Sequence, residues 1–160
     1  MKEGQSLDYT SIGYHFGVLN RRSQAFISYA CQPWRLSYAE YVILVELYRS
    51  DGRSQDDVCK SLTADKALIA RNVKTLEAKG YIRRKQDDAD RRFKYIYLTE
   101  KAQRIRQALL DILQRWIHET TKGMDQALIE QTIQGLQIAA RNAANLSIES
   151  IADTKGETEK

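Results

Sequence analysis

Apolar residues recur at the spacing of an α-helix along the first thirty positions of the chain. Intervals of three, four or seven residues place them on one face of a helix from Tyr9 to Ala30, at Ile12, Phe16, Leu19, Phe26 and Ala30. The sequence Gln32-Pro33-Trp34 ends this helix, because proline lacks the backbone donor and disfavours a helical conformation of the residue before it.

Two further helix starts are marked by a serine that is followed three residues later by a carboxylate. Ser37 with Glu40 predicts a second helix, and Ser54 with Asp57 predicts a short third helix that ends at Leu62. In this pattern the serine hydroxyl and the carboxylate each accept a hydrogen bond from a backbone amide that the start of the helix leaves without a partner.

A fourth helix and a hairpin follow directly. The turn Thr63-Ala64-Asp65 leads into a helix that ends at Gly80, a residue type common just after a last helical turn. Residues 80–85 then predict a strand, residues 86–90 a polar turn and residues 92–98 a return strand rich in β-forming residues. Short adjacent helices followed by a hairpin predict a helix-turn-helix with a β wing.

Two longer amphipathic helices complete the pattern, the first capped by Thr99. Their apolar residues are Ala102, Ile105, Leu109, Ile112, Trp116 and Ile117 in the first, and Leu128, Ile129, Ile133, Leu136, Ala140 and Ala143 in the second. We therefore expect a mainly α protein with a small β-hairpin wing. The expected parts are a helical region of residues 1–34 and 99–148, which the family resemblance given below implies is the dimerisation region, a winged helix-turn-helix module of residues 35–98, and a disordered tail of residues 149–160.

Composition narrows the class of protein. A hydrophobic content of 42% is enough for a folded core. No apolar run approaches the roughly 20 residues of a membrane span, and residues 1–4 open no signal peptide, so we expect a cytoplasmic protein without a membrane partner. Cys31 and Cys59 form no paired motif, and with the two histidines they give no metal-ligand spacing.

Catalytic patterns are also missing from the sequence. We find no Ser/His/Asp order, no glycine loop of the kind that holds phosphate and no dense cluster of metal ligands. The sequence predicts no cofactor, no metal and no enzymatic activity.

Positive charge is concentrated in the centre of the chain. Between Lys60 and Arg106 there are 14 Lys and Arg against 6 Asp and Glu, whereas the remainder holds 11 basic and 15 acidic residues. Clusters of Lys and Arg often bind along the phosphate backbone of a nucleic acid, although solvent-exposed helix faces also carry runs of charged residues.

The fourth helix has two faces of different chemistry. Ile69, Val73 and Leu76 fall within about 60° of one another on a helical wheel and are expected to be buried. The opposite face combines small residues with cations, as a helix entering the major groove needs, and its predicted DNA contacts are Lys66, Ala67, Ala70, Arg71 and Lys74. Arg71 is the best candidate for a base contact, since its guanidinium can pair with guanine O6 and N7. Lys66 and Lys74 are expected to hold phosphates.

Basic residues also flank the turn of the predicted wing. A cationic hairpin beside a recognition helix can place an arginine in the adjacent minor groove. The predicted DNA contacts of the wing are Arg84, Arg91, Arg92 and Lys94.

At this point the chain resembles the MarR family of winged helix-turn-helix transcriptional regulators. The segments that carry the resemblance are Leu36–Leu44, Leu76–Arg84, Asp87–Arg92 and Tyr95–Ala102. They are similar, in order and spacing, to the second helix, the end of the recognition helix with its entry to the wing, the wing itself and its Leu-Thr exit. The resemblance covers roughly residues 12–146.

The resemblance implies a function and partners. It implies a homodimer built from the first and the last two helices, which binds double-stranded palindromic DNA, usually as a repressor, and is released by a small ligand or an oxidant. Ala67, Leu68 and Ala70 depart from the hydroxyl residues frequent in that family. This departure leaves open an alternative, a winged-helix protein-interaction module without sequence-specific DNA binding. A metal-sensing winged repressor would need more His and Cys ligands.

Candidate regulatory residues lie on the first two predicted helices and between them. Cations beside aromatic residues would suit a small aromatic or phenolic ligand, and the candidates are His15, Arg21, Arg22, Trp34, Ser37 and Tyr41. The aromatics could instead be core residues, and the arginines could form surface ion pairs. Cys31 is a candidate redox sensor, because cations such as Arg35 could lower the pKa of its thiol. The alternative is that both cysteines are simply buried.

Overall fold

The computed structural model describes residues 9–86 and 94–147 and confirms a mainly helical chain with a small antiparallel sheet. The chain divides into two compact units after His118. None of the helices in the described ranges is long and apolar enough to cross a membrane.

The first helix and the turn after it have the expected bounds. Helix α1 runs from Tyr9 to Ala30 and is followed by the 3-10 helix η1, Gln32–Trp34. Arg35 then adopts a left-handed conformation with φ 54°. Helix α2, Tyr38–Arg49, begins with the predicted capping box: the Glu40 amide donates to the Ser37 hydroxyl at 3.2 Å, and the Glu40 carboxylate accepts from the Ser37 amide at 2.7 Å.

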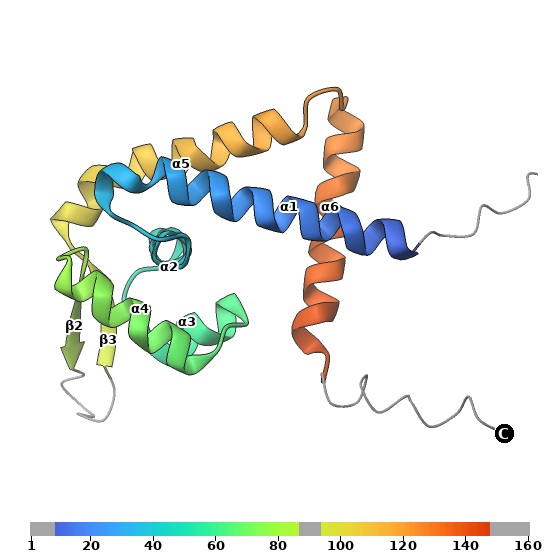
Figure 1. The fold of residues 1–160 in the computed structure, drawn as a ribbon. Helices are drawn as coiled ribbons and strands as arrows, with labels where there is room; N and C mark the ends of the chain where they lie inside the picture. The colour runs from blue at the N-terminus through green and yellow to red at the C-terminus, as the bar shows by residue number, and fades with distance from the viewer. Residues whose placement is uncertain (1–8, 87–93, 148–160) are drawn as a thin grey trace, which may run out of the picture. The chain divides into compact units, whose positions relative to one another are not determined.

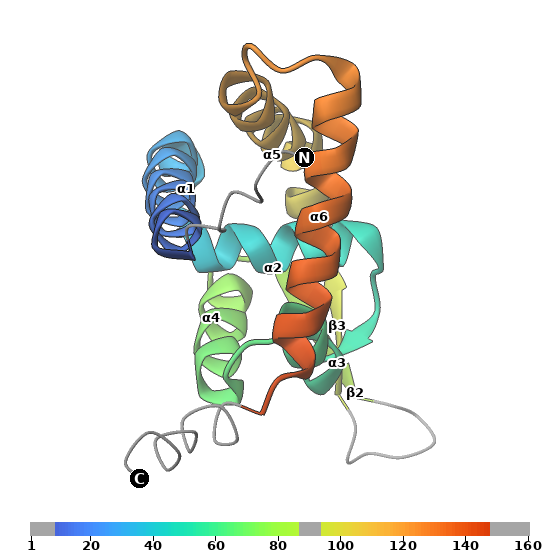
Figure 2. The same ribbon diagram turned by 90° about the vertical axis from the view of Figure 1, so that its right-hand side faces the viewer.

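Helices α3, Gln55–Leu62, and α4, Lys66–Ala78, form the helix-turn-helix. Ser54 and Asp57 make the second predicted capping box at the start of α3. Gly80 follows α4 with φ 74°, a conformation that costs glycine little because it has no Cβ. In both ribbon views α2 lies between α1 and α4 (Figure 1; Figure 2).

The sheet differs from the predicted hairpin because it has a third strand. Strands β2, Ile82–Gln86, and β3, Lys94–Leu98, pair antiparallel, with Ile82 opposite Leu98. The two-residue strand β1, Arg53–Ser54, pairs with the other edge of β3, so the order is β1-β3-β2. The predicted strands began at residues 80 and 92; β2 begins two residues later than expected, and residues 92 and 93 lie outside the described residues.

A single apolar core holds these elements together. Its fully buried members come from α2, α3, α4, the sheet, α5, Glu100–Thr120, and the turn after α1, and include Leu44, Val58, Leu76, Ile96 and Leu109. Two tyrosines of α2 also donate to backbone carbonyls of α5: Tyr41 to Leu109 at 3.3 Å, and Tyr48 to Ala102 at 2.6 Å. The core therefore fixes α4 and the sheet on one scaffold.

The second unit consists of helix α6, Gln126–Asn145, and the residues around it. Asp125 caps the helix by accepting from the Leu128 amide at 2.8 Å. The helix carries the predicted apolar stripe, but none of its residues is buried.

Candidate nucleic-acid interface

Helix α4 has the two faces that the sequence predicts. Ile69, Val73 and Leu76 are buried in the core. On the other side Lys66, Ala67, Arg71 and Lys74 are exposed, and Ala70 is half-buried. We call these five residues the α4 cationic face. The burial pattern is confirmed, whereas the contact of this face with DNA remains a prediction.

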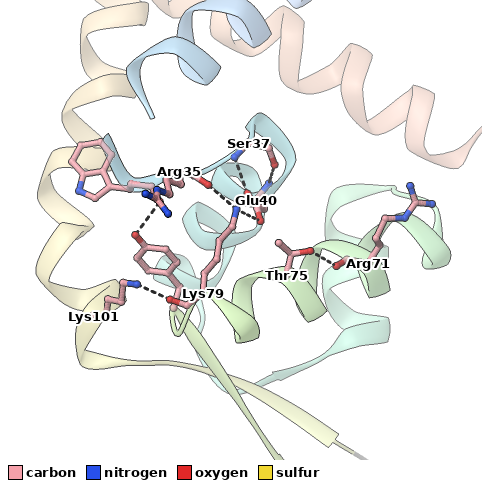
Figure 3. A network of polar contacts seen from close by, with 9 residues as sticks. Arg35, Ser37, Glu40, Arg71, Thr75, Lys79 and Lys101 are labelled. Carbon is pink, nitrogen blue, oxygen red and sulfur yellow. Dashed lines mark hydrogen bonds and ion pairs between the residues drawn. The ribbon is translucent and has the colours of Figure 1, made fainter. Parts of the chain in front are cut away.

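Local hydrogen bonds fix the helix that carries this face. The Asp65 carboxylate accepts from the Leu68 amide at 2.9 Å and so satisfies a donor of the first turn. The Thr75 hydroxyl donates to the Arg71 carbonyl at 3.0 Å, and the Arg71 side chain extends away from the helix (Figure 3). Arg71 can therefore reach outward from a rigid backbone.

Two of the predicted DNA contacts already have a carboxylate partner. The Lys66 ammonium lies 3.1 Å from the Asp56 carboxylate, and both side chains are largely exposed. Arg84 donates through Nε to Glu77 at 2.9 Å and through a second guanidinium nitrogen to the same oxygen. This hydrogen bonding lowers the pKa of the Glu77 carboxyl. Arg84 therefore ties β2 to α4, and two of its guanidinium nitrogens are already hydrogen-bonded to Glu77.

The wing presents further cations along its strands. Lys94 is exposed at the start of β3. The Arg83 guanidinium lies over the Tyr97 ring, 5.1 Å from its centroid, where cation–π attraction holds it. The predicted contacts Arg91 and Arg92 lie outside the described residues.

The six predicted ligand residues occupy different environments. His15, Arg21 and Arg22 are exposed along α1. The Ser37 hydroxyl caps α2, and Tyr41 is buried with its hydroxyl bonded to α5. Trp34, the sixth, is half-buried in η1. Two of the six therefore have structural roles: the capping by Ser37 was expected from the sequence, and the bond of Tyr41 to α5 was not.

A hollow of about 430 Å³ lies between α1, α2 and α4 instead. None of the six residues lines it. Its walls include Gln24, Tyr38, Val42, Leu68 and Asn72. Sequence reasoning missed these residues, although Tyr38 and Val42 are four apart in α2 and share one helix face.

The structure corrects the prediction for Cys31. Its side chain is fully buried, and burial raises the pKa of the thiol to about 11. A redox sensor needs the opposite, an accessible thiol with a lowered pKa. Arg35 does not compensate, because the desolvation of Cys31 is the cause of the shift. Cys59 is buried as expected, and burial raises the pKa of its thiol as well.

We expect both thiols to be inert in the folded protein. Iodoacetamide at about pH 8 should modify neither Cys31 nor Cys59 in native buffer, since both are buried with the thiolate disfavoured. The same reagent should label both in denaturant, as followed by mass spectrometry. Rapid labelling of Cys31 in native buffer would restore the sensor hypothesis.

Comparisons with known proteins agree with this architecture. The model of the MarR family matches residues 36–94, which span α2 to the start of β3. The HTH-type transcriptional regulator BilQ of Clostridioides difficile (strain CD3) is 22% identical over 134 residues, which cover 84% of this chain and 90% of that protein.

Solved structures give the same result. A MarR transcriptional regulator from Methanosarcina mazei Go1 is 28% identical with a TM-score of 0.79, over 84% of this chain and 96% of that one. A MarR family regulator from Listeria monocytogenes, solved in complex with a 26mer DNA, shares the fold with a TM-score of 0.81 at 20% identity, over 98% and 99% of the two chains. Residues 36–94 therefore match the MarR family model, and the chain is similar in sequence and in fold to transcriptional regulators of that family.

Proposed function

We propose that the chain binds double-stranded DNA sequence-specifically as a homodimer on a palindromic operator and represses transcription until a small ligand releases it. The observation that carries the proposal is the α4 cationic face. Its cations stand on a helix whose other side is locked into the core. Its small residues would let the backbone approach base edges in a major groove.

The residues on this surface have different proposed roles. Arg71 reads a base, because it is exposed and its guanidinium can form two hydrogen bonds with guanine. Lys66 and Lys74 hold phosphates, as do Lys94 and the wing arginines beside the groove. Lys66 must exchange its Asp56 partner for phosphate, which its exposure permits.

A second copy of the chain is the proposed partner of the unburied apolar residues. On α6, Ile133 and Leu136 are 47% and 44% exposed, and Ile12, Phe16 and Leu19 of α1 are exposed as well. Large apolar residues recurring along one helix face mark an interaction surface rather than a solvated one. A two-fold dimer would present two α4 helices to half-sites about one helical turn apart.

The hollow between α1, α2 and α4 is the proposed place for the releasing ligand. It combines apolar walls with the Tyr38 ring and the amides of Gln24 and Asn72. These groups fit a small aromatic or phenolic ligand. Asn72 belongs to α4, so a bound ligand would touch the proposed recognition helix directly.

Replacing Arg71 with alanine tests the base contact. We expect the affinity for an operator, selected from a random DNA pool, to fall by roughly 5- to 150-fold, because a bidentate base contact is lost. Affinity for unrelated DNA should change far less. Fluorescence anisotropy at several salt concentrations measures both. Arg104→Ala is the matched control, since Arg104 is an exposed arginine on α5 and is not part of the α4 cationic face.

Lys74→Ala in the same titration separates phosphate contacts from base contacts. It should weaken binding to both DNAs alike and reduce the salt slope by about one. If the unaltered protein bound no DNA at low salt, the proposal would be wrong, and a winged-helix protein-interaction module would become the better hypothesis.

A further inference from the structure

The side chain of Lys79, at the end of the recognition helix, is fully engaged inside the protein. Its Nζ lies 2.7 Å from each carboxylate oxygen of Glu40 and 2.6 Å from the backbone carbonyl of Arg35. A lysine ammonium has three protons, and here three acceptors surround it (Figure 3). The side chain is only 29% exposed. These contacts leave it poorly placed to serve a phosphate.

The carboxylate that faces Lys79 serves a second element at the same time. The Glu40 side chain is 3% exposed, and one of its oxygens also accepts from the Ser37 amide at 2.7 Å, as part of the α2 capping box. Glutamine would complete a capping box equally well. The charge of Glu40 is therefore not needed to start α2, and what it adds is the ion pair with the end of α4.

A second attachment joins the same two places. The Tyr81 hydroxyl donates to the Trp34 carbonyl at 3.1 Å. Lys101 donates to the Lys79 carbonyl at 2.6 Å and lies 4.4 Å from the centre of the Tyr81 ring. Two successive carbonyls of the α1–α2 turn, residues 31–37, are thus held by residues that end and follow α4. The left-handed backbone of Arg35 fixes the direction of the second carbonyl.

We propose that Glu40 and Lys79 are positioning residues for DNA recognition, which tie the end of α4 to the α1–α2 turn and thereby set the placement of the α4 cationic face. We call Glu40, Lys79 and the carbonyls of Trp34 and Arg35 the turn clamp. The proposal rests on the proposed DNA-binding function. It makes the α1–α2 turn the part of the protein through which a displacement of α1 reaches the recognition helix.

The physical argument is the cost of separating a buried pair. The capping box joins Glu40, in the first turn of α2, to Ser37. Moving this segment together with the α1–α2 turn away from α4 would leave the Glu40 carboxylate buried with one amide partner, which is far less favourable than moving α4 with it. The recognition helix should therefore follow the turn as one body. A buried ion pair often adds little net stability, because desolvation offsets the attraction. We therefore expect the turn clamp to set the placement of the α4 cationic face and to add little to the stability of the protein.

The test compares Glu40→Gln, which keeps the capping box, with Lys79→Met, which keeps the aliphatic stem. The control variants are Glu119→Gln and Lys122→Met, because these residues form an exposed ion pair in the second unit. Two measurements are made on the full chain: anisotropy titrations of the selected operator and of unrelated DNA, and amide hydrogen exchange without DNA.

We expect each clamp variant to lose roughly tenfold in operator affinity, with little change on unrelated DNA and an unchanged salt slope. The double variant should be no worse than Lys79→Met alone, since the two residues act as one unit. Without DNA, the amides of Arg35 and Lys79 should exchange faster together in the clamp variants. The control variants should match the unaltered protein in every measurement.

Three results would overturn the proposal. A salt slope reduced by about one in Lys79→Met, with equal losses on both DNAs, would make Lys79 a phosphate contact. Operator affinity that stays unchanged in both variants would remove the positioning role. Exchange that rises at Lys79 but not at Arg35 would show that the turn and α4 are not coupled. If the unaltered protein preferred no operator, the proposed function would fail, and the exchange data would still decide whether the turn and α4 are linked.

Discussion

Replacing Leu136 with glutamate should convert the proposed homodimer to a monomer and lower its affinity for a two-half-site operator by about 10²- to 10⁴-fold. Leu136 lies in the middle of an apolar stripe on α6, at intervals of three and four residues with Ile129, Ile133, Ala140 and Ala143. None of these side chains is buried within the chain. A charge at the centre of a dimer interface would be desolvated without a partner.

The same helix provides a matched control. Ile138 is 58% exposed but lies about 140–160° around the helix from Ile133, Leu136 and Ala140. Ile138→Glu should therefore leave the dimer and the operator affinity intact. Analytical ultracentrifugation gives the mass of each variant, and anisotropy gives its affinity for DNA. Equal effects of the two substitutions would argue that the apolar stripe is not the dimer interface.

Replacing Arg53 with methionine should lower the free energy of unfolding by about 3–5 kcal/mol, because it strips the main partner from a buried carboxylate. The side chain of Glu46 is 9% exposed and accepts from the Arg53 guanidinium and from the Ser61 hydroxyl. Arg53 also donates to the Asp57 carbonyl at 3.0 Å. This network joins α2, β1 and α3, so the loss should be felt through the whole module.

Urea denaturation followed by circular dichroism measures the loss. Arg49→Met is the control, since Arg49 approaches the same carboxylate at 3.6 Å but is 79% exposed. It should cost less than about 1 kcal/mol. Adding Glu46→Gln to Arg53→Met should restore much of the stability, because no buried charge then remains. A double variant as unstable as Arg53→Met would show that packing, not charge, determines the loss.

The features that could be predicted from the sequence are those determined by neighbouring residues. A capping box needs only residues three apart, so Ser37 with Glu40 and Ser54 with Asp57 predicted the starts of α2 and α3. The buried and exposed faces of α4 follow from helical periodicity, and the structure has both. The β-forming residues on either side of a polar turn predicted the hairpin of β2 and β3, and the MarR-like motifs agreed with this order of elements.

The features that could not be predicted depend on residues far apart in the chain. Strand β1 is only two residues long, so no alternation marks it, and its partners Tyr95 and Ile96 lie more than forty positions away. The engagement of Arg84 by Glu77 requires the fold of β2 against α4. The burial of Cys31 likewise comes from packing, which no local pattern reports.

The pairing of β1 with β3 also has a consequence for the order of folding. Helices α3 and α4 and the β2–β3 hairpin use contacts between residues close in sequence, which form early because they close short loops. The bonds that join β1 and the preceding Gly52 to β3, such as that from the Gly52 amide to the Ile96 carbonyl at 3.1 Å, close a loop of more than forty residues and cost more chain entropy. The helix-turn-helix should therefore form before β1 pairs with β3, and β1 should be the last strand of the sheet to form.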